Sequence, residues 1–209
     1  MLIIPNFLGV IIDEKLNWSY HINLVKRKVS KGLGIMHKAK KVLNESTLIT
    51  LYYSFIYPYL HYGILAWGMT FKCFLDPLIK IQKRAVRVIA MATRDAHTNP
   101  IFRRLNILNI SNIYVLNVMM FMLKYKRRLL PNVFEGMFVV NNEIHGHYTR
   151  QATKFHSATG RLEIVRRSIR VQGVCIWNLL SNRINSDCSP VTFKFRIKKC
   201  LISTDFEYM

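Results

Sequence analysis

The sequence predicts a mainly α protein, and three observations lead to that prediction. The chain has 209 residues, 51% hydrophobic and 20% charged, so it is long and apolar enough to bury a core. Apolar or amphipathic segments typical of helices cover 19–40, 47–71, 74–92 and 112–130. Strand-like patterns are confined to 7–13 and to the part after Pro131. We therefore expect a helical bundle, preceded by a short β segment and followed by a small mixed α/β C-terminal part.

The first segments of the chain read as a strand and then a helix. The stretch "FLGVIID" (7–13) is typical of a buried strand, with Pro5 before it and Asp13-Glu14 after it. A helix is predicted from about Ser19 to near Lys40. Its apolar residues keep helical spacing; they are Ile22, Val25, Val29, Leu33 and Met36. Asn44 or Ser46 is suited to cap the helix that follows.

Residues 47–71 contain no charged side chain and are long enough to span a bilayer. Three features oppose a span, and one of them is that Gly63, Gly68 and His61 weaken a single apolar rod. Pro58 removes a backbone hydrogen bond in the middle of the segment. Five tyrosines also lie in its middle, whereas membrane helices concentrate Tyr at their ends. We expect a helix to about Tyr57 and then a second buried piece, with a membrane span as the alternative.

The strongest functional signal lies in 74–92. Asp76 is predicted to be the N-cap, with Pro77 at the first helical position. Leu78, Ile81, Ala85, Val88 and Ile89 then share one side of the helix, and the opposite side is basic. The basic residues there are Lys80, Lys83, Arg84 and Arg87.

Four like-charged pairs at spacings of three and four residues each cost about 0.2–0.5 kcal/mol in an isolated helix. A face of one sign suggests phosphates, or an acidic surface of a parent protein, as the partner. Ordinary solvated charge is the alternative. The same argument applies more weakly to Lys26, Arg27 and Lys31.

The C-terminal third changes in composition. Ser111 is predicted to cap a buried helix that Pro131 stops, which places a domain boundary near 131. The stretch 137–155 looks β-like and rich in loops. "SIRVQGVCIWNLLS" (168–181) looks like a strand that leads into a helix. Ser189 and Pro190 are suited to begin a last helix.

The sequence predicts neither catalytic residues nor a metal site. Acids close in sequence occur only at Asp13-Glu14 and at Asp205 and Glu207, so a catalytic carboxylate pair is not evident. His145 and His147 lack a third ligand nearby. The four cysteines are scattered, which indicates a reducing, intracellular compartment.

The charge balance predicts a polyanionic partner. Thirty-one Lys and Arg oppose eleven Asp and Glu, for a formal net charge of +20. Such an excess fits RNA or DNA, or an anionic membrane surface. It also fits a part of a larger protein whose acidic part lies elsewhere.

Six blocks in a fixed order resemble a known family. They are "FLGVIIDEKLNWSYHI", "LYYSFIYPYLHYGILAWG", "LDPLIKIQKRAVRVI", "AHTNPIFRRLNILNISNIY", "EIHGHYTR" and "SIRVQGVCIWNLL". Over roughly residues 6–200, the chain resembles the C-terminal part of reverse transcriptases from non-LTR retrotransposons (LINE elements, jockey-like). The resemblance implies that 1–18 ends the palm, with Phe7, Leu8 and Gly9 in a primer-gripping β-hairpin. It implies that 19–130 is a helical thumb and connection that contacts the template–primer duplex, and that 131–209 is a C-terminal extension.

One departure from the family decides the expected activity. The paired catalytic aspartates and the Mg²⁺ ions that they hold belong to a region upstream of the LGV-x-x-D block. We therefore expect a truncated, nucleic-acid-binding chain without cofactor, small-molecule substrate or polymerase activity of its own, located in the nucleus or cytoplasm. Its further partners would be the palm and fingers of a full-length element protein. The alternatives are a small basic membrane-associated protein anchored by 47–71 and a non-functional pseudogene product.

Overall fold

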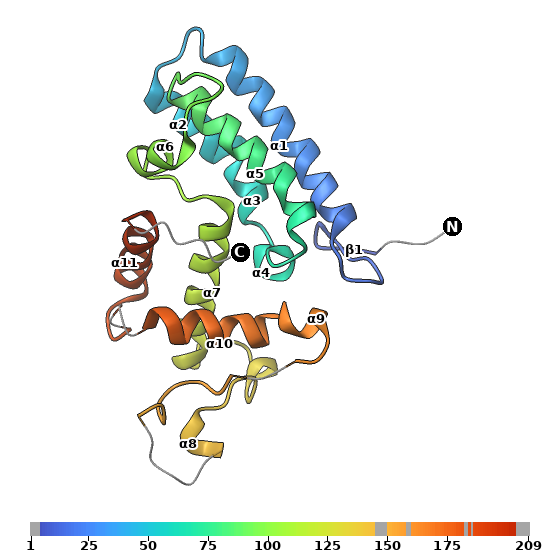
Figure 1. The fold of residues 1–209 in the computed structure, drawn as a ribbon, viewed down its shortest axis with the longest axis vertical. Helices are drawn as coiled ribbons and strands as arrows, with labels where there is room; N and C mark the ends of the chain where they lie inside the picture. The colour runs from blue at the N-terminus through green and yellow to red at the C-terminus, as the bar shows by residue number, and fades with distance from the viewer. Residues whose placement is uncertain (1–4, 145–149, 158–159, 182–183, 185, 204–209) are drawn as a thin grey trace. The chain divides into compact units, whose positions relative to one another are not determined.

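The computed structural model describes residues 5–144, 150–157, 160–181, 184 and 186–203, and it is mainly helical, as predicted (Figure 1). The chain divides into two compact units. Unit 1 comprises Met1–Tyr114 and Leu201–Met209, and unit 2 comprises Val115–Cys200. The boundary expected near 131 on sequence grounds stays a prediction.

Unit 1 is a helical bundle that begins with a β-hairpin. Its longest helices, α1 and α5, lie side by side (Figure 1). Val29 and Met36 of α1 and Leu75 and Leu78 of α5 have no exposed surface. The elements are β1 (Asn6–Phe7), β2 (Val10–Ile11), α1 (Ser19–Ala39), α2 (Glu45–Phe55), α3 (Tyr57–His61), α4 (Ile64–Trp67), α5 (Lys72–Ile89), α6 (Thr98–Arg104) and the first residues of α7 (Ile110–Lys126).

The charge-free segment 47–71 folds into the three short helices α2, α3 and α4. Every fourth residue along it is at most 1% exposed; these residues are Leu48, Tyr52, Ile56, Leu60 and Ile64. Other large side chains on the same helices are exposed, such as Tyr59 and Tyr62. The segment is therefore buried along one stripe, and the expectation of buried core holds for that stripe but not for the exposed sides of the same helices.

None of the helices in the described residues is both long and apolar enough to cross a membrane.

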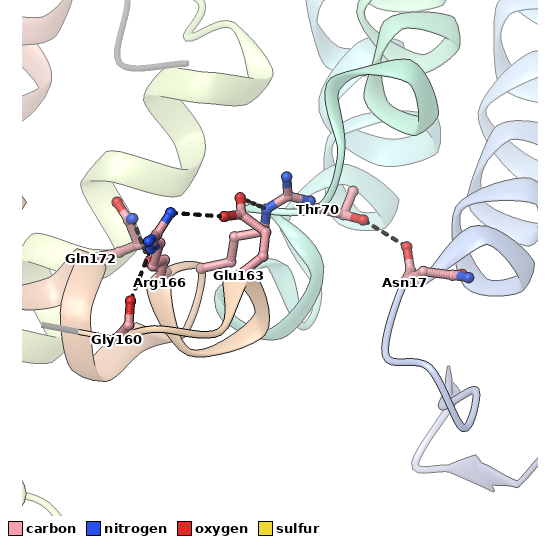
Figure 2. A network of polar contacts seen from close by, with 7 residues as sticks. Asn17, Thr70, Gly160, Glu163, Arg166 and Gln172 are labelled. Atoms are coloured by element: carbon pink, nitrogen blue, oxygen red, sulfur yellow. Dashed lines mark hydrogen bonds and ion pairs between the residues drawn. The ribbon is translucent and has the colours of Figure 1, made fainter.

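The connection into α1 is fixed by hydrogen bonds to one buried acid. Asp13 is 7% exposed, and its carboxylate accepts from the backbone N–H groups of Asn17 (3.1 Å) and Trp18 (2.7 Å). The hydroxyl of Thr70 donates to the carbonyl of Asn17 at 2.6 Å (Figure 2). Helix α1 then begins at Ser19, as predicted.

The N-terminal segment is not a buried strand as predicted from 7–13. Two short antiparallel strands pair Asn6 with Ile11 and Phe7 with Val10, and they form the β-hairpin that the resemblance implied. Phe7 is 66% exposed. The reason is that β1 and β2 form a sheet of their own with two strands, which offers little surface for burial.

The predicted start of α5 is wrong, whereas the predicted cap of α2 is confirmed. Asn44 accepts from the N–H of Thr47 at 2.9 Å. Helix α5 begins at Lys72, so Asp76 is not its cap and Pro77 lies inside the helix. Proline keeps a helical φ there but removes one backbone hydrogen bond. Burial of Leu75 and Leu78 on either side offsets that loss.

Unit 2 packs helices around a cluster of aromatic rings. The rings of Tyr125 and Phe138 are 4.8 Å apart, and those of Phe155 and Trp177 are 6.4 Å apart. Glu163 forms ion pairs with Arg166 and Arg167 on the surface (Figure 2). The elements are the rest of α7, the 3-10 helix η1 (Asn132–Phe134), α8 (Asn141–Ile144), α9 (Glu163–Arg166), α10 (Ile169–Leu180) and most of α11 (Pro190–Ser203).

The C-terminal part is helical rather than mixed α/β in the described residues, which corrects the prediction. The β-like stretch 137–155 holds α8 and a single β-bridge between Val140 and Phe155. Residues 169–180 are helical throughout. Their buried positions follow a helical period and outweigh the strand propensity of the β-branched residues; they are Gly173, Val174, Ile176, Trp177 and Leu180.

Of the two helix caps predicted in the C-terminal third, the one for α7 is wrong and the one for α11 is confirmed. Asn109, and not Ser111, caps α7 by accepting from the N–H of Asn112 at 2.8 Å. Helix α7 ends at Lys126, before Pro131, because Arg128 takes a left-handed conformation with φ of 53°. Ser189 caps α11 as predicted, through a 3.2 Å bond from the N–H of Thr192.

A buried amide joins three parts of unit 1. Gln82 on α5 is 1% exposed. Its Nε2 donates to the hydroxyl of Tyr52 (2.8 Å) and to the carbonyl of Leu108 (3.0 Å), and its Oε1 accepts from the N–H of Ile110 (2.9 Å). Burial raises the pKa of Tyr52 well above its usual range, so its hydroxyl stays protonated.

We predict opposite effects of alanine at two glycines of α1. A Cβ at Gly32 would lie 2.8 Å from the carbonyl oxygen of Phe55, whereas a Cβ at Gly34 would meet nothing within 4 Å. Gly32→Ala should lower the free energy of unfolding by about 1–3 kcal/mol. Gly34→Ala should raise it by about 0.5–1 kcal/mol, since alanine favours the helix. Urea unfolding of both variants tests this, and equal effects would contradict the packing.

We also predict that Gln82→Leu is strongly destabilising. The substitution leaves the hydroxyl of Tyr52, the carbonyl of Leu108 and the N–H of Ile110 without their bonds to Gln82. Each such buried group costs about 1–3 kcal/mol, so a loss of at least 3 kcal/mol is expected. Tyr52→Phe removes only one of the three bonds and should cost about 1 kcal/mol. Thermal unfolding measures both, and a loss for Gln82→Leu no larger than that for Tyr52→Phe would refute the role of the amide.

Candidate nucleic-acid interface

Helix α5 carries four cations on one face. Because the helix is continuous from Lys72 to Ile89, the spacing at 100° per residue places Lys80, Lys83, Arg84 and Arg87 within about one third of a turn. The buried residues of α5, such as Leu78, Ala85 and Ile89, occupy the opposite side. Lys80 and Arg84 are exposed, and Lys83 and Arg87 are half-buried. We call these four residues the α5 basic face.

An acid lies on the same side of this helix, and the sequence prediction had counted it only as the N-cap. Asp76 sits inside α5, four residues before Lys80, where an acid N-terminal to a base is favourable. It offsets part of the repulsion at that end of the face. Among the described residues, no ion pair joins an acid to any of the four cations. The α5 basic face thus stays strongly positive.

Arg87 differs from the other three cations because its side chain also holds a loop. Its Nε donates to the carbonyl of Ala96 at 2.9 Å. Lys83, Arg87 and residues 95–100 line an open hollow of ≈ 580 Å³ beside the face. The guanidinium is therefore fixed in place, while its terminal nitrogens keep further donors for an anion.

The cations predicted on α1 do not extend this face. Lys26, Arg27 and Lys31 are all exposed. Arg27 and Lys31 lie on the side of α1 opposite its buried stripe of Val25, Val29 and Leu33. That stripe faces the core that α1 shares with α5, and the α5 basic face points away from the same core. Each group therefore lies on the outer side of its own helix.

Lys28, which directly continues the run of Lys26 and Arg27, was not among the predicted site residues. Its Nζ lies 5.1 Å from the centre of the Tyr59 ring, within cation–π range. The spacing to Gly32 could have indicated this position of Lys28. Lys28 precedes Gly32 by one helical turn, and Gly32 lies on the side of α1 that approaches the end of α2. A bidentate pair between Arg104 and Glu45, at 2.9 and 2.7 Å, was missed as well.

The predicted primer-grip-like residues form the tip of the hairpin. Leu8 and Gly9 make a two-residue turn with φ of 49° and 84°. Leu8 is unusual there, because a side chain disfavours positive φ, and it is 74% exposed. The hydroxyl of Tyr62 donates to the carbonyl of Leu8 at 2.6 Å and holds the turn against α3.

His21 lies beneath this hairpin. It is 3% exposed, and its Nδ1 accepts from the N–H of Ile11 at 3.3 Å. Its ring centre is 5.7 Å from that of Trp67. Burial, and secondarily the charge of Lys28, lowers the pKa of His21. The neutral ring with its proton on Nε2 follows from these contacts.

The described residues contain no group of three or more His, Cys, Asp or Glu side chains suited to bind a metal ion. His145 and His147 lie outside the described residues. No protein-family model matches this chain, and neither a curated protein nor a solved structure matches it.

We predict that His21 makes unit 1 less stable in mild acid. Its pKa is lower in the folded state than the ordinary 6.5, so below pH 6.5 the unfolded chain binds more protons. Stability should therefore fall as the pH decreases from about 6.5 towards the folded pKa. His21→Gln, which keeps an acceptor for Ile11, should flatten this part of the curve of melting temperature against pH.

A further measurement checks the cause. His21 lines an open pocket of unit 1 together with three other titratable groups, which are Lys28 on the same helix, Tyr59 and Tyr62. Lys28→Gln removes a positive charge and should bring the His21 pKa closer to 6.5, as NMR titration can measure. An unchanged pH dependence in His21→Gln would show that another group causes it.

Proposed function

We propose that this chain binds the phosphate backbone of a nucleic-acid duplex through the α5 basic face. The single observation that supports the proposal is that Lys80, Lys83, Arg84 and Arg87 share one side of a continuous helix whose other side is core. Phosphate contacts fix a protein on a duplex without reading its sequence. The partner is therefore RNA, DNA or their hybrid, bound without strong sequence preference.

The spacing of the charges suits a duplex. From Lys80 to Arg87 the helix rises about 10 Å at 1.5 Å per residue. Phosphates follow one another about every 3.4 Å along the axis of one strand, so this length matches about three such steps. Four cations held over that distance can neutralise several consecutive phosphates.

The like-charge repulsion favours a ligand over plain solvation. Four neighbouring pairs each cost about 0.2–0.5 kcal/mol in water, and Asp76 offsets only the pair nearest to it. Anions bound to the face would remove this repulsion. An evenly solvated surface helix more often mixes both signs.

The resemblance to non-LTR retrotransposon reverse transcriptases makes the ligand more specific. It implies that this helix belongs to a thumb-like part that contacts the template–primer duplex. We propose the same role here, for binding alone. Nucleotide addition is outside the proposal, because the catalytic aspartates of that family lie outside the stretch that the resemblance covers.

We predict a salt dependence that belongs to this face. If four phosphates are neutralised, log K should fall against log salt with a slope of about −3.6 on B-form DNA. Changing all four cations of the face to Gln should flatten the slope by about that amount and weaken binding equally for unrelated sequences. Fluorescence anisotropy with a DNA duplex and an RNA–DNA hybrid measures both effects.

A matched variant separates the contribution of the α5 basic face to binding from that of the net charge of the protein. Arg161, Arg170, Lys194 and Lys199 are exposed residues of unit 2, and changing them to Gln removes the same four charges. This control should keep most of the slope. Equal losses in both variants would show that only the total charge of the protein matters.

A third variant guards against misfolding. Arg87→Gln also removes the bond to the Ala96 carbonyl. Lys80→Gln, Lys83→Gln and Arg84→Gln together leave that bond intact and should flatten the slope by about 2.7. A folded triple variant, judged by circular dichroism, that binds with the native slope would overturn the proposal.

A further inference from the structure

The hollow beside the α5 basic face carries polar groups that phosphate binding alone does not use. It is open, has a volume of ≈ 580 Å³, and shares Lys83 and Arg87 with the face. That volume lies within the range of about 300–1,000 Å³ that is usual for ligand pockets. The rest of its wall comes from residues 95–100, among which Asp95, His97 and Asn99 are exposed. The hollow therefore continues the α5 basic face and adds an acid, an imidazole and an amide to it.

The loop that forms this wall is folded onto the end of α5 by hydrogen bonds. Met91 takes a left-handed conformation with φ of 51°, and the N–H of Ala92 donates to the carbonyl of Arg87 at 3.0 Å. Further along, the N–H of Ala96 donates to the carbonyl of Thr93 at 3.3 Å, and Nε of Arg87 donates to the carbonyl of Ala96 at 2.9 Å. The hollow is thus formed by the fold, and a ligand can enter it without first ordering the loop.

The charges of this wall are mixed, and that pattern decides the class of ligand. Lys83 and Arg87 offer an ammonium and a guanidinium to an anion. Asp95 would repel the same anion, and no ion pair joins it to either cation in the part of the chain that the structure describes. An ionised carboxylate only accepts hydrogen bonds. A ligand that uses the whole hollow therefore carries an anionic group for the two cations and a hydrogen-bond donor for Asp95.

We propose that the hollow takes one unpaired nucleotide, at the end of a duplex bound to the α5 basic face, and that it selects a base with an amino group. The phosphate of this nucleotide contacts Lys83 and Arg87, and the amino group donates to the carboxylate of Asp95. The ring of His97 offers a flat surface to the base. The inference rests on the proposed function, because the bound duplex brings its end to the hollow.

The carboxylate requires a base that is unpaired. Inside a duplex, the Watson–Crick edge of a base is bonded to the complementary strand, whereas an unpaired base presents that edge to the protein. Cytosine, adenine and guanine carry an amino group there. Thymine and uracil have carbonyl oxygens in its place, which Asp95 repels. The hollow should therefore discriminate between cytosine and thymine, which are similar in size.

Short duplexes with one overhanging nucleotide test this in the native protein. Two otherwise identical duplexes end in a single overhanging dC or dT, and a third is blunt. Sets with 3′ and with 5′ overhangs cover both strand directions. Fluorescence anisotropy should show about tenfold tighter binding of the dC duplex than of the dT duplex in one of these sets. A ratio below about threefold in both sets would overturn the proposal.

Asp95→Asn tests the acceptor, and Asp76→Asn is its matched control. Both changes remove one negative charge and should tighten the binding of every duplex, so the ratio of the dC and dT affinities is the readout that is free of this effect. An amide accepts from cytosine and donates to thymine alike, so the ratio should fall to about one in Asp95→Asn. It should stay about tenfold in Asp76→Asn, because Asp76 does not line the hollow. A folded Asp95→Asn protein with the native ratio would overturn the proposal.

His97→Ala tests the flat surface. It should weaken the dC duplex about fivefold relative to the blunt duplex, since a base that stacks on a side chain loses that contact. An unchanged preference for the dC duplex over the blunt one, in protein that is folded by circular dichroism, would refute the stacking on His97.

The hollow and the α5 basic face fail in different measurements. Lys80 and Arg84 belong to the face but do not line the hollow. Changing both to Gln should flatten the salt slope on the blunt duplex by about 1.8 and leave the dC to dT ratio at about tenfold. A native slope in that variant would refute the role of the face alone. Equal binding of the dC and dT duplexes by native protein, with the expected salt slope, would refute the hollow alone.

Discussion

The buried amide of Gln82 connects α5 to α2 and to the start of α7 in unit 1. This side chain donates to Tyr52 of α2 and to the carbonyl of Leu108, and it accepts from the N–H of Ile110 at the start of α7. It therefore fixes the rotation of α5 about its own axis. Lys83 follows Gln82 directly and Arg87 lies five residues further on, so the amide that sets the inner side of the helix also sets where the cations point.

Gln82 and His21, two buried polar residues of unit 1, differ in how many of their polar atoms have hydrogen-bond partners. Gln82 has partners for its donor and for its acceptor, which is the ordinary condition of a buried amide. His21 has a partner for Nδ1 only. A fully paired group stabilises the fold and is closed to ligands. A half-paired buried group costs stability in the folded protein.

Local patterns allowed the helices and most of the α5 basic face to be predicted. The spacing of apolar residues located α1, and Ser189 and Pro190 located the start of α11. A single periodicity was enough to place Lys80, Lys83, Arg84 and Arg87 on one side of α5. Local patterns misled at helix termini. Asp76-Pro77 resembled a helix start, although α5 begins earlier, at Lys72 after Phe71. The rings of Phe71 and Phe74 pack edge to face at this start. Local patterns also misled in 169–175, where burial overrode the strand propensity of Ile169, Val171 and Val174.

The pocket that His21 lines and the amide of Gln82 could not be predicted because each joins residues that are distant in sequence. Gln82 meets Tyr52 across 30 residues, and Tyr62 meets Leu8 across 54. No periodicity reports such contacts. In the structure, Gly32 lies where α1 closely approaches the end of α2, and Leu8 at positive φ lies in a turn that a contact from outside the hairpin holds. A strained, exposed residue persists only where surrounding contacts determine its conformation. At Leu8 that contact is Tyr62, whose ring also walls the pocket, so the hairpin tip and the pocket form one structural feature of unit 1.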